Sequence, residues 1–498
     1  MNCELKLQLK CLSKLLRYFL FALSFLVFSF GYFDNSFNIM LVSVAMMWCC
    51  SVMYCLENWN SRMLLLMFNV VLFVFLIGRP LIDLFCGSKW HFSEYNANFF
   101  AVSSIYLSLI SLMFGQWLGE CKNCEICKKS EAVKEYSSNL GAFRKFEYIR
   151  NLRIISLMLF YVSIIFLFAV EIEKLLYMRG RNYEEIYVSF KTNLPYVVNA
   201  LSSMCKYFLC IFLATMPSKK GSLLPLALFI ISNVPCFLIG GRSKLVVGFI
   251  FVLVYFMIRD ILADREKWFG NIEKFLILVG SPVALAFLGA YNYIREGKKI
   301  APSGFLSLIV DFFYKQGVSF EVLKIGYNTI PKIKYTGFVN YTFGEVVDYL
   351  LHGTLAQLLW GAESLGSGQT QKLGLYSSLL ANRMAYTASK TQFLKGHGWG
   401  SSYLLETYAD WGYVGIVIFS LLLGWLFARM IFYLKKGVFP ATIVLLVLTS
   451  IYYCPRSSAT FWMSFVVYAQ CWVSVALCFL CAGICTKKYS ISLGESKA

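Results

Sequence analysis

The sequence predicts an all-α polytopic integral membrane protein of about twelve transmembrane helices, on the strength of three observations. Of the 498 residues, 58% are hydrophobic and only 15% are charged, whereas about 25% are charged in a typical soluble protein. Apolar runs long enough to cross a hydrocarbon core about 30 Å thick recur along the chain. The lysines and arginines gather in the connections between these runs. We therefore interpret residues 1–498 as a single transmembrane domain.

Twelve apolar runs of roughly spanning length follow one another along the chain. They are Tyr18–Phe33, Phe37–Leu56, Met63–Ile82, Ala97–Leu118, Leu152–Val170, Tyr196–Met216, Leu223–Ile239, Leu245–Ile258, Phe275–Tyr293, Tyr413–Tyr433, Phe439–Tyr453 and Ser458–Ala482. The first run lacks a small-x-small cleavage pattern, so we expect an uncleaved helix rather than a signal peptide. Three of the runs are short, which leaves eleven or thirteen helices as alternatives.

The distribution of cations predicts the orientation of the helices. With a cytoplasmic N-terminus, twelve crossings place the lysine-rich connection 119–151 and the other short basic connections inside, as the positive-inside rule requires. Both termini are then cytoplasmic. The formal net charge of +19 is explained by these connections beside anionic membrane lipid, and we expect no nucleic-acid partner.

One long hydrophilic insertion, residues 294–412, separates the ninth run from the tenth on the outer side. Within it, Phe305–Tyr314 and Val346–Trp360 are apolar-rich and of helical length. Such helices often lie in the membrane interface; a small core folded on itself is the alternative. The insertion closes with the glycine- and serine-rich stretch Gly396–Ser402, and we expect the chain to re-enter the membrane at Tyr413.

A tight turn with the sequence Gly240-Gly241-Arg242-Ser243-Lys244 joins the seventh and eighth runs. Glycine permits a positive φ and a close approach to a ligand, and the planar guanidinium matches phosphate oxygens. We predict that Arg242 faces a lipid-linked diphosphate. The alternative is a hairpin whose cations reach out to headgroups. Arg456, in Cys454-Pro455-Arg456-Ser457-Ser458, occupies a second turn of this kind.

Other charged residues near the outer surface are further candidates. For the diphosphate contact they are Arg179, Arg181, Arg295, Arg383 and Lys244, with solvated loop charge as the alternative. For the group that accepts a proton from the attacking hydroxyl they are His397, Glu406 and Asp410. Glu406 and Asp410 are four residues apart, so on a helix they share a face. Ordinary carboxylates at a helix start are the alternative.

Four segments, taken together, resemble the O-antigen polymerase, or Wzy, family of bacterial polysaccharide polymerases. They are Gly240–Ser243, Gly396–Ser402, Glu406–Gly415 and Pro455–Ser457, and their order covers most of the chain. The resemblance implies a glycosyltransferase of the bacterial inner membrane. Its donor and acceptor would be undecaprenyl-diphosphate-linked oligosaccharides on the periplasmic side. The resemblance also implies a fold similar to class C glycosyltransferases, and it makes a chain-length regulator a candidate partner.

The chemistry of such a reaction agrees with the residues present. A sugar on a lipid diphosphate already carries a good leaving group, so the enzyme must align two substrates and neutralise the departing diphosphate. The chain has no nucleotide-binding signature and no Asp-x-Asp motif. We therefore expect no cofactor and a metal-independent site.

Two other functions remain open at this point. An O-antigen ligase would use the same carrier and transfer the finished glycan to lipid A core. A flippase or transporter of the lipid-linked oligosaccharide should show two related halves. The polar residues instead concentrate in one insertion, and no half-to-half symmetry is visible, which favours an enzyme over a transporter.

Overall fold

The computed structural model describes residues 3–86, 95–131, 139–181, 183–262, 266–295, 299, 304–334, 339–366 and 368–495. Within these residues the regular structure is helical, and no strand occurs. The chain forms two compact units. The first unit comprises Met1–Glu120, Phe269–Arg429 and Tyr452–Phe461, and the second comprises Cys121–Trp268, Met430–Ile451 and Trp462–Ala498.

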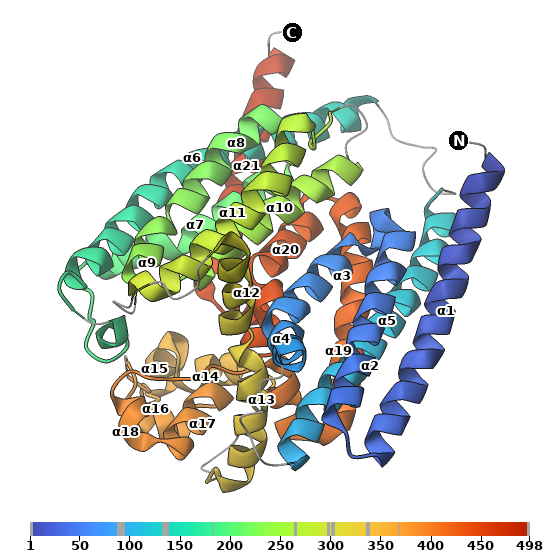
Figure 1. The fold of residues 1–498 in the computed structure, drawn as a ribbon. Coiled ribbons are helices and arrows are strands. Elements are labelled where there is room, and N and C mark those ends of the chain that lie inside the picture. The colour runs from blue at the N-terminus through green and yellow to red at the C-terminus, as the bar shows by residue number, and fades with distance from the viewer. Residues whose placement is uncertain are drawn as a thin grey trace. The chain divides into compact units, whose positions relative to one another are not determined.

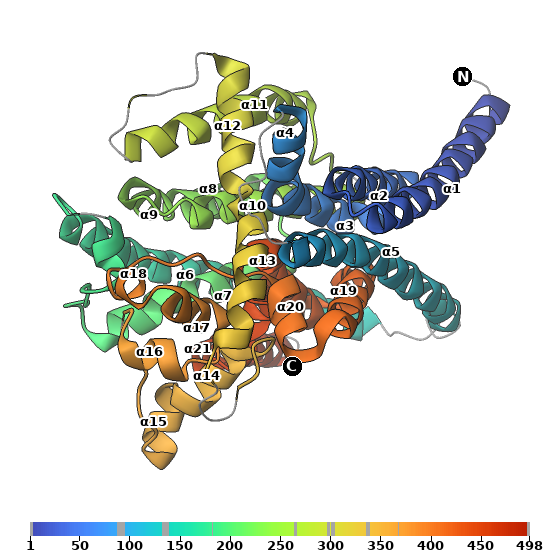
Figure 2. The ribbon, with the colours of Figure 1, turned by 60° about the horizontal axis from the view of Figure 1, so that its bottom comes forward.

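The first unit holds the N-terminal helices and the long insertion. Its elements are α1 (Cys3–Phe33), α2 (Phe37–Glu57), α3 (Trp59–Leu72), the π-helix η1 (Phe73–Ile77), α4 (Gly78–Cys86), α11 (Asn271–Arg295), α12 (Phe305–Gln316), α13 (Val318–Thr329), the 3-10 helix η3 (Ile330–Lys332), α14 (Gly344–His352), α15 (Thr354–Trp360), α16 (Gln371–Tyr376), α17 (Leu380–Ala388) and α18 (Lys390–Leu394). In Figures 1 and 2, α12 lies beside α11 and α4, and these pairs are in contact.

The second unit is built on the long helix α6. Its elements are α6 (Asn139–Tyr177), the 3-10 helix η2 (Tyr183–Tyr187), α7 (Tyr196–Ala214), α8 (Lys219–Ile231), α9 (Val234–Ile239), α10 (Ser243–Leu262), α20 (Val438–Leu448) and α21 (Ala469–Glu495). Four elements have residues in both units: α5 (Tyr95–Glu131), α19 (Tyr403–Lys436) and the 3-10 helices η4 (Ile451–Arg456) and η5 (Phe461–Val466). Helices α7 and α21 both pack against α6.

Twelve helical segments in the described residues are long and apolar enough to cross a membrane. Each of them overlaps one of the twelve predicted runs, so the predicted polytopic, all-α class is confirmed. The segments most deeply packed inside the protein include Tyr95–Cys121, of whose most apolar window 78% is buried. Polar contacts are made there as well: the Tyr403 hydroxyl and the Ser108 hydroxyl are 2.5 Å apart, which fixes the first residue of α19 against α5.

The structure corrects two predicted boundaries. Helix α19 begins at Tyr403, ten residues before the predicted re-entry at Tyr413, and it bends at Gly412, whose φ is 63° and ψ −153°. The last spanning helix begins at Ala469 instead of Ser458. The Ala459 amide binds the Glu406 side chain, which ties these two segments together, and residues Phe461–Val466 form the 3-10 helix η5 before the last spanning helix.

In the described residues, the insertion between α11 and α19 contains seven α-helices, α12 to α18, and the 3-10 helix η3. The two apolar-rich stretches are helical as predicted, although Gly353 divides the second into α14 and α15. Much of the apolar side of α14 and α15 is exposed: Leu358, Leu359 and Trp360 have exposed fractions of 80%, 69% and 61%. The helices are therefore amphipathic, and one side of them is left without protein cover in the described structure.

Candidate functional site

Glu406 lies at the centre of the candidate site, in the first turn of α19. Its side chain is completely buried. The Ala459 amide donates a hydrogen bond of 2.7 Å to Oε2 of Glu406. A typical hydrogen bond contributes about 0.5–1.5 kcal/mol, and leaving a buried amide unpaired costs about 1–3 kcal/mol. This bond therefore holds the segment 456–460, which we call the Arg456 turn, against the start of α19.

Arg456 opens this turn and is partly exposed. Its Nη1 donates a hydrogen bond of 3.1 Å to the Gln316 carbonyl at the end of α12. The guanidinium carbon lies 5.6 Å from the centre of the Phe75 ring. Since a guanidinium has five N–H donors, this one bond positions the group and leaves it able to bind a further acceptor.

Asp410 attaches a third segment to the same place. Its two carboxylate oxygens accept hydrogen bonds from the backbone amides of Tyr341 (3.1 Å) and Thr342 (2.7 Å). The Thr342 carbonyl in turn accepts a hydrogen bond of 2.7 Å from the Thr460 hydroxyl of the Arg456 turn. Glu406 and Asp410 do share a helix, as predicted, and here each of them binds backbone amides.

Several hydroxyl groups are buried in the segments that meet at Glu406. Those of Ser401 and Ser458 interact with the Glu406 carboxyl group, whereas those of Ser402 and Thr342 are buried without a hydrogen bond among the described residues. Leaving a buried polar group unpaired costs about 1–3 kcal/mol, and native proteins contain few such groups. The glycine- and serine-rich stretch and the Arg456 turn therefore both contribute hydroxyl groups to the surroundings of Glu406.

Two carboxyl groups of α14 complete the cluster, and neither was foreseen from the sequence. Asp348 accepts hydrogen bonds from the Ser377 hydroxyl (2.6 Å) and the Ser378 amide (2.5 Å). Glu345 lies one turn earlier and is partly exposed. Burial and the nearby Asp348 carboxylate raise the pKa of Glu345 to about 7. Glu406 of α19 lies near Glu345.

Glu345, Asp348, Glu406 and Asp410 form what we call the carboxylate cluster. Its members come from α14 and α19 and surround the joint between α14, α19 and the Arg456 turn. They do not converge on one point, and in the described residues no three His, Cys, Asp or Glu side chains are grouped so as to hold a metal ion. Glu345, Asp348 and Asp410 are partly exposed, and of these three only Glu345 has no hydrogen bond to its carboxyl group from the described residues.

The other predicted residues of the first unit lie differently. Arg383 is buried, and its guanidinium donates to the Ser377 carbonyl (2.5 Å) and to the Lys334 carbonyl (3.4 Å). His397 is exposed. Arg295 is the last residue of α11, but its side chain lies outside the described part of the chain. Arg383 therefore holds the helices of the insertion together.

The Arg242 turn belongs to the second unit and has the predicted form. Gly240 ends α9 in the left-handed region, with a φ of 116°, and α10 begins at Ser243. Arg242 is partly exposed. Lys244 lies 3.2 Å from the Glu171 carboxylate, which also binds Lys174 at 2.9 Å. Glu171 was not among the residues predicted from the sequence; it follows a long apolar run and gives Lys244 a partner within the protein.

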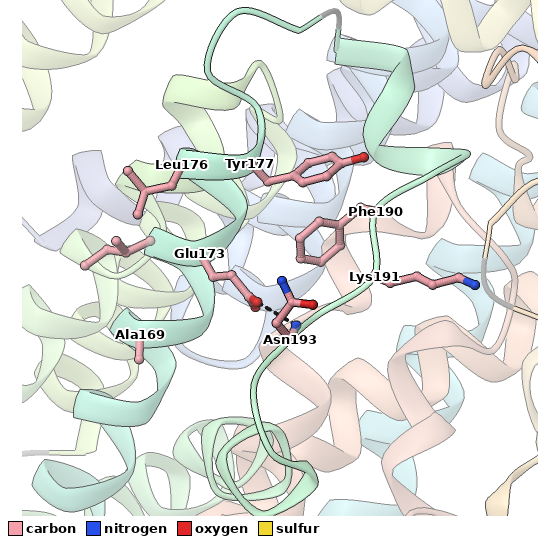
Figure 3. Close-up of a pocket in the computed structure, with 8 residues that line it drawn as sticks. Ala169, Glu173, Leu176, Tyr177, Phe190, Lys191 and Asn193 are labelled. Atoms are coloured by element: carbon pink, nitrogen blue, oxygen red, sulfur yellow. Dashed lines mark hydrogen bonds between the residues drawn. The ribbon is translucent and has the colours of Figure 1, made fainter.

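Arg179 and Arg181 follow α6 and are both exposed. Arg181 stacks on the Tyr177 ring at 4.4 Å and lies 3.6 Å from Glu185. Tyr177 lines a cavity of about 370 Å³ between the end of α6 and the segment 190–193 (Figure 3). Of the predicted residues, Arg181 is thus associated with a pocket.

The lining of this cavity is mainly apolar. Glu173 accepts hydrogen bonds from the Asn193 amide (2.7 Å) and the Thr192 hydroxyl (2.6 Å), and it fixes the segment to α6. In Figure 3 the Lys191 side chain points away from the other labelled residues. Glu173 therefore has a structural task here, and we place the candidate site at the carboxylate cluster.

Comparison with known proteins identifies the family. The family model described as O-antigen polysaccharide polymerase Wzy matches residues 16–489 of this chain. No curated protein matches the chain. No solved structure matches it either, so the expected likeness to class C glycosyltransferases stays a prediction.

The raised pKa of Glu345 predicts a pH-dependent effect on stability. A carboxyl group whose folded pKa lies above its unfolded value stabilises the fold below about pH 4.5, and this contribution is lost as the pH rises to about 7. Glu345→Gln mimics the neutral form. We expect it to raise the free energy of unfolding by about 1–3 kcal/mol at pH 8, with almost no effect at pH 4.5.

Thermal unfolding of the detergent-solubilised protein at the two pH values measures this difference. Glu363→Gln is the matched control, because Glu363 is exposed and its carboxylate pairs with Lys372 at 2.7 Å. A gain in stability for Glu345→Gln that is equal at pH 4.5 and pH 8 would contradict the assignment.

Proposed function

We propose a specific reaction for this chain, which belongs to the O-antigen polysaccharide polymerase Wzy family and therefore acts in polymerising O-antigen repeat units. The substrates are undecaprenyl-diphosphate-linked oligosaccharides, one as donor and one as acceptor. The reaction takes place at the periplasmic face of the bacterial inner membrane. The observation that supports this best is the Arg456 turn, held by a buried carboxylate beside a group of acidic residues.

The proposed reaction is a glycosyl transfer between two lipid-linked chains. A hydroxyl of the acceptor sugar attacks the anomeric carbon of the donor, and the bond from that carbon to the diphosphate breaks. The hydroxyl proton passes to a base, and the lipid diphosphate leaves with the bonding electrons. Arg456 stabilises the negative charge that develops on the diphosphate, because a preformed cationic donor needs little reorganisation during the reaction.

The roles of the other candidates follow from their contacts. Glu406 and Asp410 hold the Arg456 turn and the start of α14 in place, through the Ala459 amide and the Tyr341 and Thr342 amides. Arg242, with Lys244, is a second diphosphate contact in the second unit. Arg179, Arg181 and Arg295 remain further candidates for the carrier headgroup, and His397 is an exposed residue close in sequence to the site.

Arginine chemistry is also the basis for proposing that the reaction needs no metal. A guanidinium binds two phosphate oxygens at once and stays charged at every physiological pH. In the same role, a magnesium ion would bind mainly through one or two carboxylates and the phosphates. Glu406 and Asp410, the acids on α19, are instead bound to backbone amides.

The partners proposed for the enzyme are the lipid-linked substrates, membrane lipid and a chain-length regulator. The exposed apolar side of α14 and α15 supports the contact with lipid. Leu358, Leu359 and Trp360 are largely exposed, and amphipathic helices with a tryptophan often lie at the level of the headgroups. Helix α14 carries Glu345 and Asp348, so this arrangement keeps the acidic residues close to the membrane surface.

The topology that we propose has both termini in the cytoplasm and the insertion of α12 to α18 in the periplasm, on the basis of the positive-inside rule. Reporter fusions after Asn123 and after Gly368 should therefore show opposite sidedness. A periplasmic reporter and a cytoplasmic reporter, each fused at both points, measure it. The same sidedness at the two points would reject the topology.

Arg456→Lys should reduce the rate of polymerisation roughly ten- to a hundredfold. Lysine keeps the charge but loses the planar pair of donors, and hydrogen bonds to charged groups contribute about 1.5–3 kcal/mol. The length and yield of polymer made from purified lipid-linked repeats measure the loss. Arg150→Lys is the matched control, since Arg150 is half-exposed and pairs with Glu147 of its own helix.

Full-length polymer from Arg456→Lys protein at the normal membrane level would mean that Arg456 does not bind the diphosphate in this way. The same assay in excess chelator tests metal independence. Polymer should form as before, whereas loss on chelation and recovery with magnesium would show that a metal ion takes part.

A further inference from the structure

The position of Glu345 gives it a task that the other acidic residues of the site do not have. Glu345 is in the first turn of α14, directly after Gly344, which packs so closely on Ser378 that a Cβ would overlap its carbonyl. Asp348, one turn later, is bound to Ser377 and Ser378. The start of α14 is therefore fixed on this side by tight packing and by two hydrogen bonds.

The other side of the same turn is fixed by α19. Asp410 binds the amides of Tyr341 and Thr342, just before α14. Thr342 is also bound by Thr460 of the Arg456 turn. Glu345 is thus held on a short and rigid connection to the turn that carries Arg456, and both residues belong to the first unit.

The carboxylate cluster has one member that a substrate can reach and whose oxygens are not already used. Glu406 is fully buried, Asp410 binds two amides, and Asp348 binds Ser377 and Ser378. Glu345 is partly exposed, and no hydrogen bond from the described part of the chain occupies its oxygens.

We propose that Glu345 is the catalytic base that accepts the proton of the attacking sugar hydroxyl. This inference rests on the proposed function. As the new glycosidic bond forms, the hydroxyl proton moves to the Glu345 carboxylate, and the lipid diphosphate leaves as an anion beside Arg456. Glu345 then releases its proton to water before the next cycle.

The surroundings of Glu345 suit this task. The titratable groups near it are Asp348 from its own helix and Glu406 from α19. Negative charge on Asp348 disfavours a second carboxylate and makes Glu345 a stronger base. Its pKa is raised to about 7, close to the value at which a general base combines sufficient ionisation with sufficient basicity.

The test is the pH dependence of kcat/KM for polymerisation by the full-length protein in proteoliposomes. The probe is the lipid-linked repeat unit isolated from cells that lack the polymerase. For the wild-type protein we expect activity to fall below a midpoint near pH 7. Glu345→Gln should lose about 10²- to 10⁴-fold in kcat and should still bind the lipid-linked repeat with the wild-type affinity.

Asp348→Asn provides an independent readout, because its amide oxygen can still accept from Ser378 while the charge is removed. The acid midpoint should move to lower pH, since Glu345 then titrates without its charged neighbour. Glu363→Gln, an exposed change in the same insertion, should leave the profile unchanged.

Wild-type kcat in Glu345→Gln would overturn the inference, and so would an acid midpoint that Asp348→Asn does not move. Failure of the wild-type protein itself to polymerise the repeat would overturn the proposed function, and with it the role of Glu345. Polymer from the wild-type protein, together with full activity of Glu345→Gln, would overturn the role of Glu345 alone.

Discussion

The buried hydrogen bond from the Ala459 amide to the Glu406 carboxylate joins two segments that are 53 residues apart in the chain. A completely buried carboxyl group is costly unless it is hydrogen-bonded, so both segments are constrained by its presence. Asp410 and Thr460 extend the joint to the start of α14. The positions of Arg456 and Glu345 depend on this joint. Arg456 lies three residues before Ala459, and Glu345 lies three residues after Thr342.

In this arrangement, the residues that hold the backbone differ from those that are proposed to react with the substrate. The fully buried acid and the acid with both oxygens in use hold the backbone, while the partly exposed charged residues at the edge of the joint are available to a substrate. The rigid connection matters because glycosyl transfer from a lipid diphosphate depends mainly on alignment and on a preformed field around the leaving group. Arginines on flexible loops would supply positive charge but would not align the two substrates.

Hydrophobic run length was sufficient to predict the twelve spanning segments, because the thickness of a bilayer sets that length directly. It was also sufficient for the Gly240 turn, where only a short polar break separates two apolar runs. The starts of α19 and of the last helix were misplaced. The sequence of residues 403–411 is typical of a loop, and that of residues 458–468 is typical of a membrane-spanning helix. Their observed secondary structure depends on contacts between distant segments.

Only some residues of the candidate site were predicted from the sequence. Arg456 and Glu406 stood out because charge beside apolar runs is rare, and the structure brings their segments together. Glu345 did not stand out, since a glutamate in the first turn of a helix is common and favourable. Its distinguishing neighbours, Glu406 and the tightly held Asp348, are revealed only by the fold. Arg383 was selected for its charge, but it is buried and bound to carbonyl groups.

A double-mutant cycle on substrate binding tests the central claim most directly, namely that Glu406 acts by holding the Arg456 turn. The affinity of undecaprenyl diphosphate without a sugar would be measured for the wild-type protein, Glu406→Ala, Arg456→Ala and the double variant. If the claim is correct, either single change removes most of the contribution of Arg456, and the double variant binds no more weakly than Arg456→Ala. Additive losses in the double variant would contradict it.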